Sequence, residues 1–287
     1  MSFFHWSSIK NQRHGVASDR RAQAPRHMKE QFLGSDNLFV QSLAKGIGLL
    51  EALGARPGAL SLTDLADLTG MDRSTTQRMT HTLVQLGYIE KGANGRGFVP
   101  GRKILDRTFD YLSHNLLIER ASPILTDLQR EAGERVDLSL FDDLSIIYAW
   151  RRQTKRQTFF ATLVGRRIPC YCSSGGRAIM SHLPQQRVDD ILARSTLRPI
   201  TPKTETDVAV IKRRIAQARE SNYALALEET LLGEIAVGCA ILDHDRQPMA
   251  ALHIAGSLSE WTVEAFVQRF TPLAIEAARA LGGGIPR

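Results

Sequence analysis

Apolar residues first recur at helical spacing in the stretch SLAKGIGLLEAL. Leu43, Ile47 and Leu50 share one face of an amphipathic helix, and Gly54 marks its end. The residues before this stretch show no such period. We therefore expect residues 1–35 to form a flexible tail ahead of the first folded segment.

Two shorter helices are expected next, joined by a tight Gly-Met-Asp turn. Ser61, with Asp64 three residues later, is a capping-box start for a helix over residues 62–69. Asp72 caps a further helix that begins at Arg73. Two short helices joined in this way predict a helix-turn-helix.

The helix that begins at Arg73 combines an apolar stripe with a polar face. Met79, Leu83 and Leu86 form the stripe that we expect to be buried. Arginine pairs with guanine, glutamine with adenine and serine with either, while threonine hydroxyls reach phosphates. The candidate DNA contacts are Arg73, Ser74, Thr75, Thr76, Gln77, Arg78, Thr80 and His81. A merely solvated face would usually carry Glu and Lys pairs, and this helix has no acidic residue, which favours DNA recognition.

A β-hairpin is expected after this helix. Residues 88–91 and 98–99 have the pattern of two strands, and an Asn-Gly turn separates them. Lys91 and Arg96 near the turn are further candidate DNA contacts, although exposed cations on a turn are often only solvated. The hairpin would complete a winged helix-turn-helix over residues 36–100.

Beyond residue 100 the pattern changes to that of an α+β fold. A helix over residues 101–118 is expected as a linker helix or dimer seam, with Leu105 and Phe109 among its apolar positions. Ser122-Pro123 then begins another helix. Strands are expected near residues 136–141, 144–150, 224–227, 235–242 and 249–255, and helices near 176–182, 187–193, 205–222 and 262–281, the last kinked or interrupted at Pro272. This order suits an antiparallel sheet with helices packed on it, in a domain of residues 119–287.

The most singular segment of this domain precedes an expected helix. Ser173, Ser174, Gly175 and Gly176 would leave backbone N–H groups unpaired at the helix start, where an anion could bind. A carboxylate is the simplest such anion, because no Gly-Lys-Ser/Thr sequence of a phosphate-binding loop follows. An ordinary Ser/Gly cap accounts for the same sequence equally well.

Other candidate chemistry in this half is weaker. A serine hydrolase is disfavoured, because the serine flanks do not match Gly-x-Ser-x-Gly and no spacing ties His182 or His253 to a serine. Cys170 and Cys172 would point to opposite faces of a strand, so we expect structural cysteines, no metal and no cofactor. His253 is either a core histidine or a ligand contact, and the Glu228-Glu229 pair either forms a polar network or marks a strand end.

Composition and charge narrow the function classes. The chain has 287 residues, enough for two domains. Three cysteines and the absence of an apolar run of about 18 residues predict a cytoplasmic protein with no membrane partner. The net charge is +7, yet residues 36–100 carry six basic and six acidic groups, whereas residues 1–35 carry six basic and two. The tail is therefore either a solubilising leader or an arm that touches nucleic acid.

Together these segments resemble the IclR-type bacterial transcriptional regulators, from about Phe39 to Leu281. SLAKGIGLLEAL and SLTDLADLTGMDRSTTQRMTHTLVQLGYIE are similar to the winged helix of that family. RRIPCYCSSGGRAIMSHLP and YALALEETLLGEIAVGCAILDHDRQPMAALHIAG resemble its effector domain. FVQSLAKG and RRIPCYCSSGGRA further resemble the branch that controls protocatechuate and 4-hydroxybenzoate breakdown.

The resemblance implies a GAF-like C-terminal domain that binds a small organic acid, commonly an aromatic one. The positions that it assigns to the effector are Ser173, Ser174, Gly175, Gly176, Ala226, Ala236, His253 and Ala255. Alanines and the imidazole replace small polar groups of the glyoxylate-type regulators there, which implies a roomier and more apolar pocket. The resemblance also implies a homodimer, often paired into a homotetramer, on a near-palindromic operator.

The sequence therefore predicts a sequence-specific DNA-binding transcriptional regulator, not an enzyme, whose activity a small acid modulates. Activation and repression are both compatible with it. The alternatives are an enzyme of small molecules with an accessory winged helix, and a sensor that recruits a protein through its C-terminal half.

Overall fold

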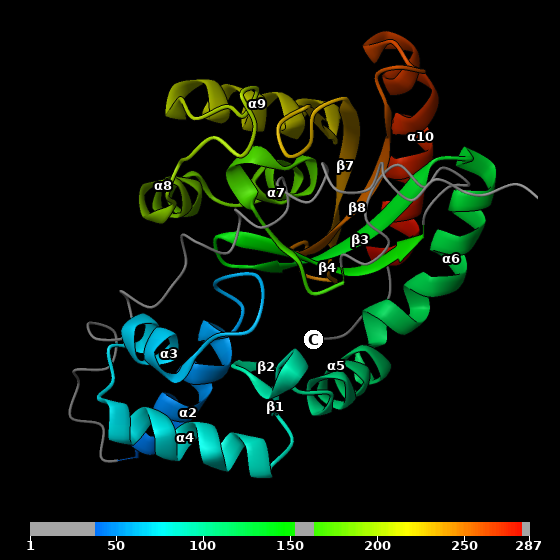
Figure 1. Ribbon diagram of the computed structural model, residues 1–287. Coiled ribbons are helices and arrows are strands. Elements are labelled where there is room, and N and C mark those ends of the chain that lie inside the picture. The colour runs from blue at the N-terminus through cyan, green and yellow to red at the C-terminus, as the bar shows by residue number, and fades with distance from the viewer. Residues whose placement is uncertain (1–37, 153–163, 283–287) are drawn as a thin grey trace, which may run out of the picture. The chain divides into compact units, whose positions relative to one another are not determined.

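The computed structural model describes residues 38–152 and 164–282 (Figure 1). The predicted tail of residues 1–35 lies outside the described residues. The chain divides between Tyr111 and Leu112 into two compact units. Within the described ranges, no helix is both long and apolar enough to cross a membrane.

Over residues 38–102, the described part of the N-terminal unit has three helices and a small hairpin. The elements are α2 (Gln41–Ala52), α3 (Leu62–Thr69), α4 (Arg73–Gln85), β1 (Ile89–Lys91), the 3-10 turn η2 (Ala93–Gly95) and β2 (Phe98–Pro100). The predicted caps are confirmed: the Ser61 side chain and Asp64 form a capping box, and the Asp72 side chain accepts the backbone N–H of Thr75. The predicted helix-turn-helix is therefore present.

The apolar faces predicted for α2 and α4 are only partly buried. Leu43 and Ile47 are 62% and 48% exposed, because α2 packs through Leu49, Ala52 and Leu53 instead. Helix α2 is apolar on more than one side, so spacing alone could not select the buried side. On α4, Leu86 is exposed because it lies just beyond the last helical residue, while Thr76 and Thr80 occupy the buried side beside Leu83.

The predicted hairpin is confirmed, although its turn is longer than expected. Lys91 pairs with Phe98 in the antiparallel register, which leaves six residues in the turn rather than an Asn-Gly pair alone. Asn94 and Gly95 both have positive φ, at 63° and 70°, as this sharp reversal requires.

The helices that follow break at a different place from the prediction. Helix α5 (Lys103–His114) ends before Asn115, whose side chain caps α6 (Leu116–Ala132), and Pro123 lies inside α6. Leu117 and Ala121 are buried in the core of the C-terminal unit. Their burial holds the first turns of α6 helical, which overrides the start signal of the Ser-Pro pair.

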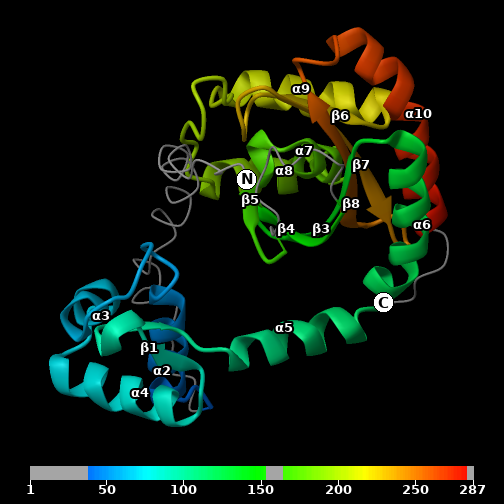
Figure 2. The same ribbon diagram turned by 45° about the vertical axis from the view of Figure 1, so that its right-hand side comes forward.

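The C-terminal unit is built on a six-stranded antiparallel sheet in the order β5-β4-β3-β8-β7-β6 (Figure 2). Its strands are β3 (Arg135–Asp142), β4 (Ser145–Arg152), β5 (Arg167–Pro169), β6 (Ala224–Leu227), β7 (Glu234–Leu242) and β8 (Pro248–Ser257). The predicted α+β class and antiparallel sheet are confirmed. Only β5 was missed, because its three residues are too few to show alternation.

Helices cover both faces of this sheet (Figures 1 and 2). They are α6 and α10 (Val263–Gly282) on one face, and α7 (Ser174–Met180), α8 (Gln185–Arg194) and α9 (Val208–Ser221) on the other. Helix α10 continues through Pro272, so the predicted interruption is wrong. Phe270 and Ala274 are fully buried on either side of the proline and hold the helix against the sheet.

Strand alternation gives the two faces different chemistry. On β3, Val136 and Leu138 face α6 and α10, in the larger apolar cluster. Asp137 and Ser139 alternate with them and are completely buried on the α7 face. The α7 face therefore holds buried polar groups that require partners.

Candidate functional site

The exposed face of α4 carries most of the predicted DNA contacts. Arg73, Ser74, Gln77, Arg78 and His81 are all exposed. The nearest acid, Asp72, accepts hydrogen bonds from the backbone N–H and the hydroxyl of Thr75 at 2.8 and 2.7 Å, and these bonds lower the pKa of Asp72. Its charge is thus held at the helix start, and α4 itself presents only neutral and basic groups to a partner.

Two threonines do not fit the predicted role. Thr76 is completely buried and its hydroxyl donates to the Asp72 carbonyl at 2.9 Å, and Thr80 is also buried. The prediction that their hydroxyls reach phosphates is therefore wrong. Both lie at helical spacing from Leu83, on the side of α4 that packs into the unit.

The hairpin places its two cations in solvent. Lys91 and Arg96 are both exposed, and the Lys91 ammonium lies 4.0 Å from the centroid of the Phe98 ring. The cation–π contact orients Lys91 along the hairpin and leaves its charge accessible to an anion.

In the C-terminal unit, the antiparallel register places four residues in one row across the α7 face. Arg151 pairs with Asp137, Asp137 with His253, and His253 with Gly238. We call these residues the charged row. It spans β4, β3, β8 and β7, which are separated by up to about a hundred residues in the chain but are neighbours in the sheet.

A second row lies beside the charged row on the same face of the sheet, displaced from it by two residues on each strand. It consists of Arg135, Ala255, Ala236 and Ala226, paired in that order across β3, β8, β7 and β6. Each of the three alanines is buried, yet none belongs to an apolar cluster of the described residues. We call the three alanines of this second row the alanine row. It brings together three of the predicted effector positions on one surface.

The start of α7 packs directly on the charged row. A Cβ atom at Gly175 would lie 2.2 Å from Cε1 of His253, and one at Gly238 would lie 2.5 Å from the carbonyl carbon of Ser174. Any side chain at either position would therefore push α7 away from the sheet. The two glycines allow the predicted loop positions to reach His253.

The His253 imidazole is held between two serines. Its Nε2 lies 2.7 Å from the Ser139 hydroxyl and its Nδ1 lies 3.2 Å from the Ser174 hydroxyl. Burial lowers the pKa of His253 to about 4, against the opposing influence of the Asp137 charge. The ring is therefore neutral at physiological pH, and both of its nitrogens are already hydrogen-bonded.

Ionised groups surround Arg151 and Arg135, which begin the two rows on β4 and β3. Asp137 accepts from Arg151 at 2.6 Å and from Arg135 at 2.9 Å, and Arg135 also donates to Glu234 at 2.6 Å. Burial alone would raise the pKa of Asp137, but the two guanidinium groups hold it below its ordinary value. The sequence did not reveal this network, because polar residues that alternate along β3 look like the solvent face of a half-buried strand.

The loop before α7 resembles an ordinary cap more than an open anion site. The backbone N–H of Gly176 donates to the Ser173 hydroxyl at 3.1 Å, so that helix-start donor is already satisfied. Cys170 and Cys172 lie in a 3-10 turn (Cys170–Cys172) rather than on a strand, and both are buried free thiols. The predicted strand alternation of these cysteines is therefore wrong.

The geometry does not form a catalytic triad. Ser174 and His253 are within hydrogen-bonding distance, but the other ring nitrogen faces the Ser139 hydroxyl rather than a carboxylate. An imidazole with a pKa near 4 is also a weak general base.

The Glu228-Glu229 pair does form a polar network, one of its two predicted roles. Glu229 is buried and ion-paired with Arg177, and it accepts from Arg214 at 3.0 Å. These contacts tie the β6–β7 connection to α7 and α9.

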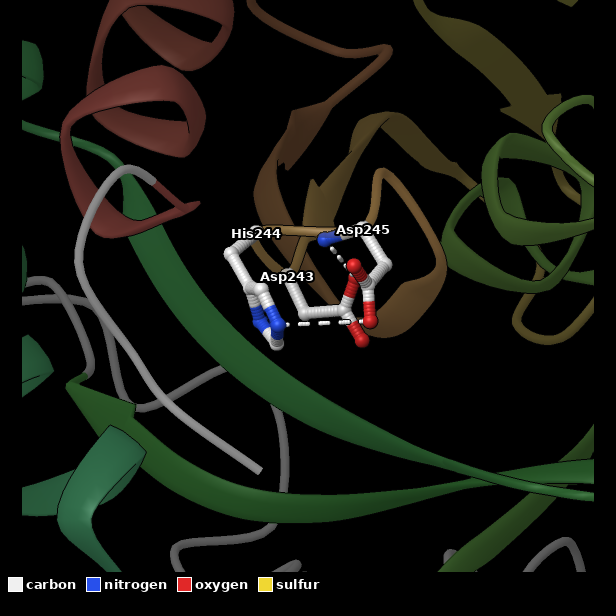
Figure 3. Close-up of side chains that lie close together, drawn as sticks. All are labelled: Asp243, His244 and Asp245. Carbon is white, nitrogen blue, oxygen red and sulfur yellow. Dashed lines mark hydrogen bonds and ion pairs between the residues drawn. The ribbon is translucent and has the colours of Figure 1, made fainter.

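One group of potential metal ligands occurs among the described residues, in the β7–β8 turn (Figure 3). Asp243, His244 and Asp245 lie side by side there. The Asp243 carboxylate accepts the backbone N–H groups of Asp245 and Gln247 at 3.0 and 2.8 Å, as in an Asx turn. The turn itself accounts for this cluster.

Comparisons with known proteins agree for both units. The model of the IclR helix-turn-helix domain matches residues 42–93, and that of the bacterial transcriptional regulator IclR C-terminal domain matches residues 109–282. Transcriptional repressor IclR of Escherichia coli is 30% identical over 84% of this chain and 88% of its own. The Pca regulon regulatory protein of Pseudomonas putida is 27% identical over 90% and 88%. The crystal structure of an IclR homolog from Microbacterium hydrocarbonoxydans, complexed with 4-hydroxybenzoate, superposes with a TM-score of 0.68 at 21% identity, over 84% of this chain and 97% of the other.

The depressed pKa of His253 predicts a specific pH dependence of stability. Between pH 6.5 and 4 the unfolded chain binds a proton at this ring and the folded chain does not, so acidification favours unfolding. This difference corresponds to about 3 kcal/mol of unfolding free energy. The free energy of unfolding can be measured by urea titration followed by fluorescence at each pH. Between pH 6.5 and 4 it should fall by about 3 kcal/mol less in His253→Gln than in the wild type. The exposed His244→Gln is the control, and equal slopes for His253→Gln and wild type would contradict the assigned pKa.

Proposed function

Since the chain belongs to the IclR family of bacterial transcriptional regulators, we propose that it reads the base sequence of an operator through α4. The observation that carries this proposal is the exposed α4 face, which offers side chains suited to base edges and no acid. The proposed DNA contacts are Arg73, Ser74, Thr75, Gln77, Arg78 and His81 on α4, with Lys91 and Arg96 on the hairpin. The named relatives are transcriptional repressors and regulators, and this chain is likewise a regulator, not an enzyme.

In this proposal α5 is the linker between a DNA-binding domain of residues 36–100 and an effector-binding domain that begins near residue 119. Its apolar residues support self-association: Leu105 and Phe109 are 67% and 69% exposed, and no residue of α5 is buried. Two copies would place their α4 helices in half-sites about 34 Å apart, on a near-palindromic operator. A further pairing of dimers would produce the tetramer.

The effector in this proposal is a small aromatic acid bound on the α7 face. The alanine row supports it, because three small apolar side chains adjoin one another there and offer no polar groups that would compete with a ring. The names of the Pca relative and of the homologue complexed with 4-hydroxybenzoate support the same class. The proposed effector-binding residues are Ser173, Ser174, Gly175, Gly176, Ala226, Ala236, His253 and Ala255.

The effector would act through a difference in affinity. An acid that prefers one arrangement of the effector domain and α5 shifts the population toward that arrangement. A coupling of about 1–3 kcal/mol would change operator affinity roughly 5- to 150-fold.

Base reading by α4 is testable with two glutamines of the same helix. Gln77→Ala should reduce discrimination between the selected operator and random DNA by about 1–3 kcal/mol, because a contact to a base edge is lost. Gln85→Ala, in the last turn, is the matched control and should change nothing. The measurement is fluorescence anisotropy on an operator selected from random duplexes. Equal weakening on operator and random DNA would mean that Gln77 contacts only the backbone.

Self-association through α5 is testable by placing a charge in its apolar surface. Phe109→Asp should weaken the dimer about 10- to 100-fold, because burial of a large apolar side chain contributes about 1.5–3 kcal/mol. Arg107→Ala changes the net charge of the same helix by the same amount on its opposite side, and it should leave the dimer intact. Sedimentation equilibrium measures the dimer dissociation constant of both variants. An unchanged constant in Phe109→Asp would exclude this surface of α5 as the dimer interface.

The effector class is testable by a thermal-shift screen of benzoate, 4-hydroxybenzoate and 3,4-dihydroxybenzoate against short aliphatic acids. A ligand of the folded state raises the melting temperature with its concentration. Ala236→Val fills the alanine row and should abolish the shift that an aromatic acid produces. Ala240→Val, on the same face of β7, should keep it. No shift with any aromatic acid would contradict the proposed effector class.

A further inference from the structure

Arg177 of α7 is a completely buried arginine with an unfinished set of hydrogen bonds. Its Nη2 donates to the Leu225 carbonyl at 3.0 Å and to the Glu229 carboxylate. Nε and Nη1 are also buried, and neither has a hydrogen-bond partner among the described residues. Buried N–H groups in folded proteins are almost always paired, so these two nitrogens require an explanation.

The contacts of Arg177 place its guanidinium at the β6 end of the alanine row. The Leu225 carbonyl that Nη2 binds belongs to the peptide that joins Leu225 to Ala226, the alanine of the row on β6. Ala224, on the same face of β6 as Ala226, lies in one apolar cluster with Ala178 of α7, the residue after Arg177. Nε and Nη1 are bonded to the same carbon as Nη2, so the unpaired donors lie beside this end of the row.

The carboxylate that binds Arg177 does not depend on it alone. Glu229 also accepts from Arg214 at 3.0 Å and from the backbone N–H of Glu205 at 3.2 Å. Arg177 meets Glu229 through Nη2, which leaves the N–H groups of Nε and Nη1 for another acceptor. Hydrogen bonds from a guanidinium to a carboxylate are among the strong ones in proteins, so an acid is the ligand that these donors suit.

The other arginines around the two rows are less suited to an acid on the alanine row. Arg135 lies at the β3 end of the row, and its Nε and Nη1 donate to Asp137 and Glu234. Arg151 lies on β4, which β3 separates from the three alanines, and two of its nitrogens meet Asp137. Arg177 combines unpaired buried donors with a contact next to an alanine of the row.

We propose that Arg177 recognises the negative charge of the effector, with the N–H groups that Leu225 and Glu229 leave free donating to its carboxylate. This inference rests on the proposed function, because it presumes that a small acid binds on the α7 face. It also assigns specificity within that site: Arg177 selects the acid group and the alanine row accepts the ring. Glu229 acts as a positioning residue that holds the guanidinium through Nη2.

Arg214 of α9 provides a matched comparison. It is the second arginine on Glu229, but its side chain is 38% exposed and it also contacts Glu205 at 3.4 Å. Loss of either arginine leaves Glu229 with the other one, so both changes disturb the same buried carboxylate. Only the loss of Arg177 removes the unpaired donors beside Ala226.

The test compares an acid with its uncharged amide. Isothermal titration calorimetry of the full-length protein would measure the Kd of 4-hydroxybenzoate and of 4-hydroxybenzamide, which keeps the ring and the phenol. The wild type should prefer the acid at least tenfold. Arg177→Met should weaken binding of the acid at least tenfold and change binding of the amide less than twofold, whereas Arg214→Met should retain the preference.

A second variant covers the case in which Arg177→Met does not fold. Glu229→Gln combined with Arg177→Met removes both charges of the buried pair and should also lose the preference for the acid. Retained preference in either folded Arg177 variant would overturn the inference while the proposed effector class stands. Equal loss in Arg214→Met would overturn it too, because the Glu229 network and not the free donors would then be responsible.

The wild type alone separates this inference from the proposed function. Equal affinity for the acid and the amide would overturn the role of Arg177 and leave an aromatic effector in place. A wild type that binds neither these compounds nor any other aromatic acid of the thermal-shift screen would overturn the proposed effector class and this inference together.

Discussion

The close approach of α7 to β7 and β8 is the constraint on which the C-terminal unit depends. Gly175 and Gly238 allow backbone to lie where any Cβ atom would collide, and His253 fills the remaining space between Ser139 and Ser174. Because this contact is made of backbone and a buried ring, α7 can shift only if the sheet face rearranges. A ligand at this contact would therefore act on the packing of α7 and not merely on a surface loop.

The same sheet face must also accommodate buried charge. Two arginines and two carboxylates neutralise one another there, and their hydrogen bonds offset part of the large cost of removing them from water. Replacement of such a set by apolar residues often stabilises a protein, so stability alone does not explain why it is present.

Local signals in the sequence predicted the helix starts correctly where the capping group lies next to the helix that it caps. Ser61, Asp64 and Asp72 act within three residues, so the chain around them determines the geometry. Signals that compete with packing were less informative. Pro123 and Pro272 lie inside helices because buried residues on either side hold those helices against the sheet. The exposed side of α2 could not be predicted either, because its apolar residues allow more than one packing side.

By itself, the sequence determined the order of the elements, the polar character of the α4 face and the small residues at the start of α7, since each depends on neighbours a few positions away. Only the tertiary structure decided that Thr76 and Thr80 are buried and that Arg151, Asp137 and His253 lie in one row. The physical reason is strand register. Pairing across the sheet joins residues that are far apart in the chain, and a slip by one residue would send each of these side chains to the opposite face.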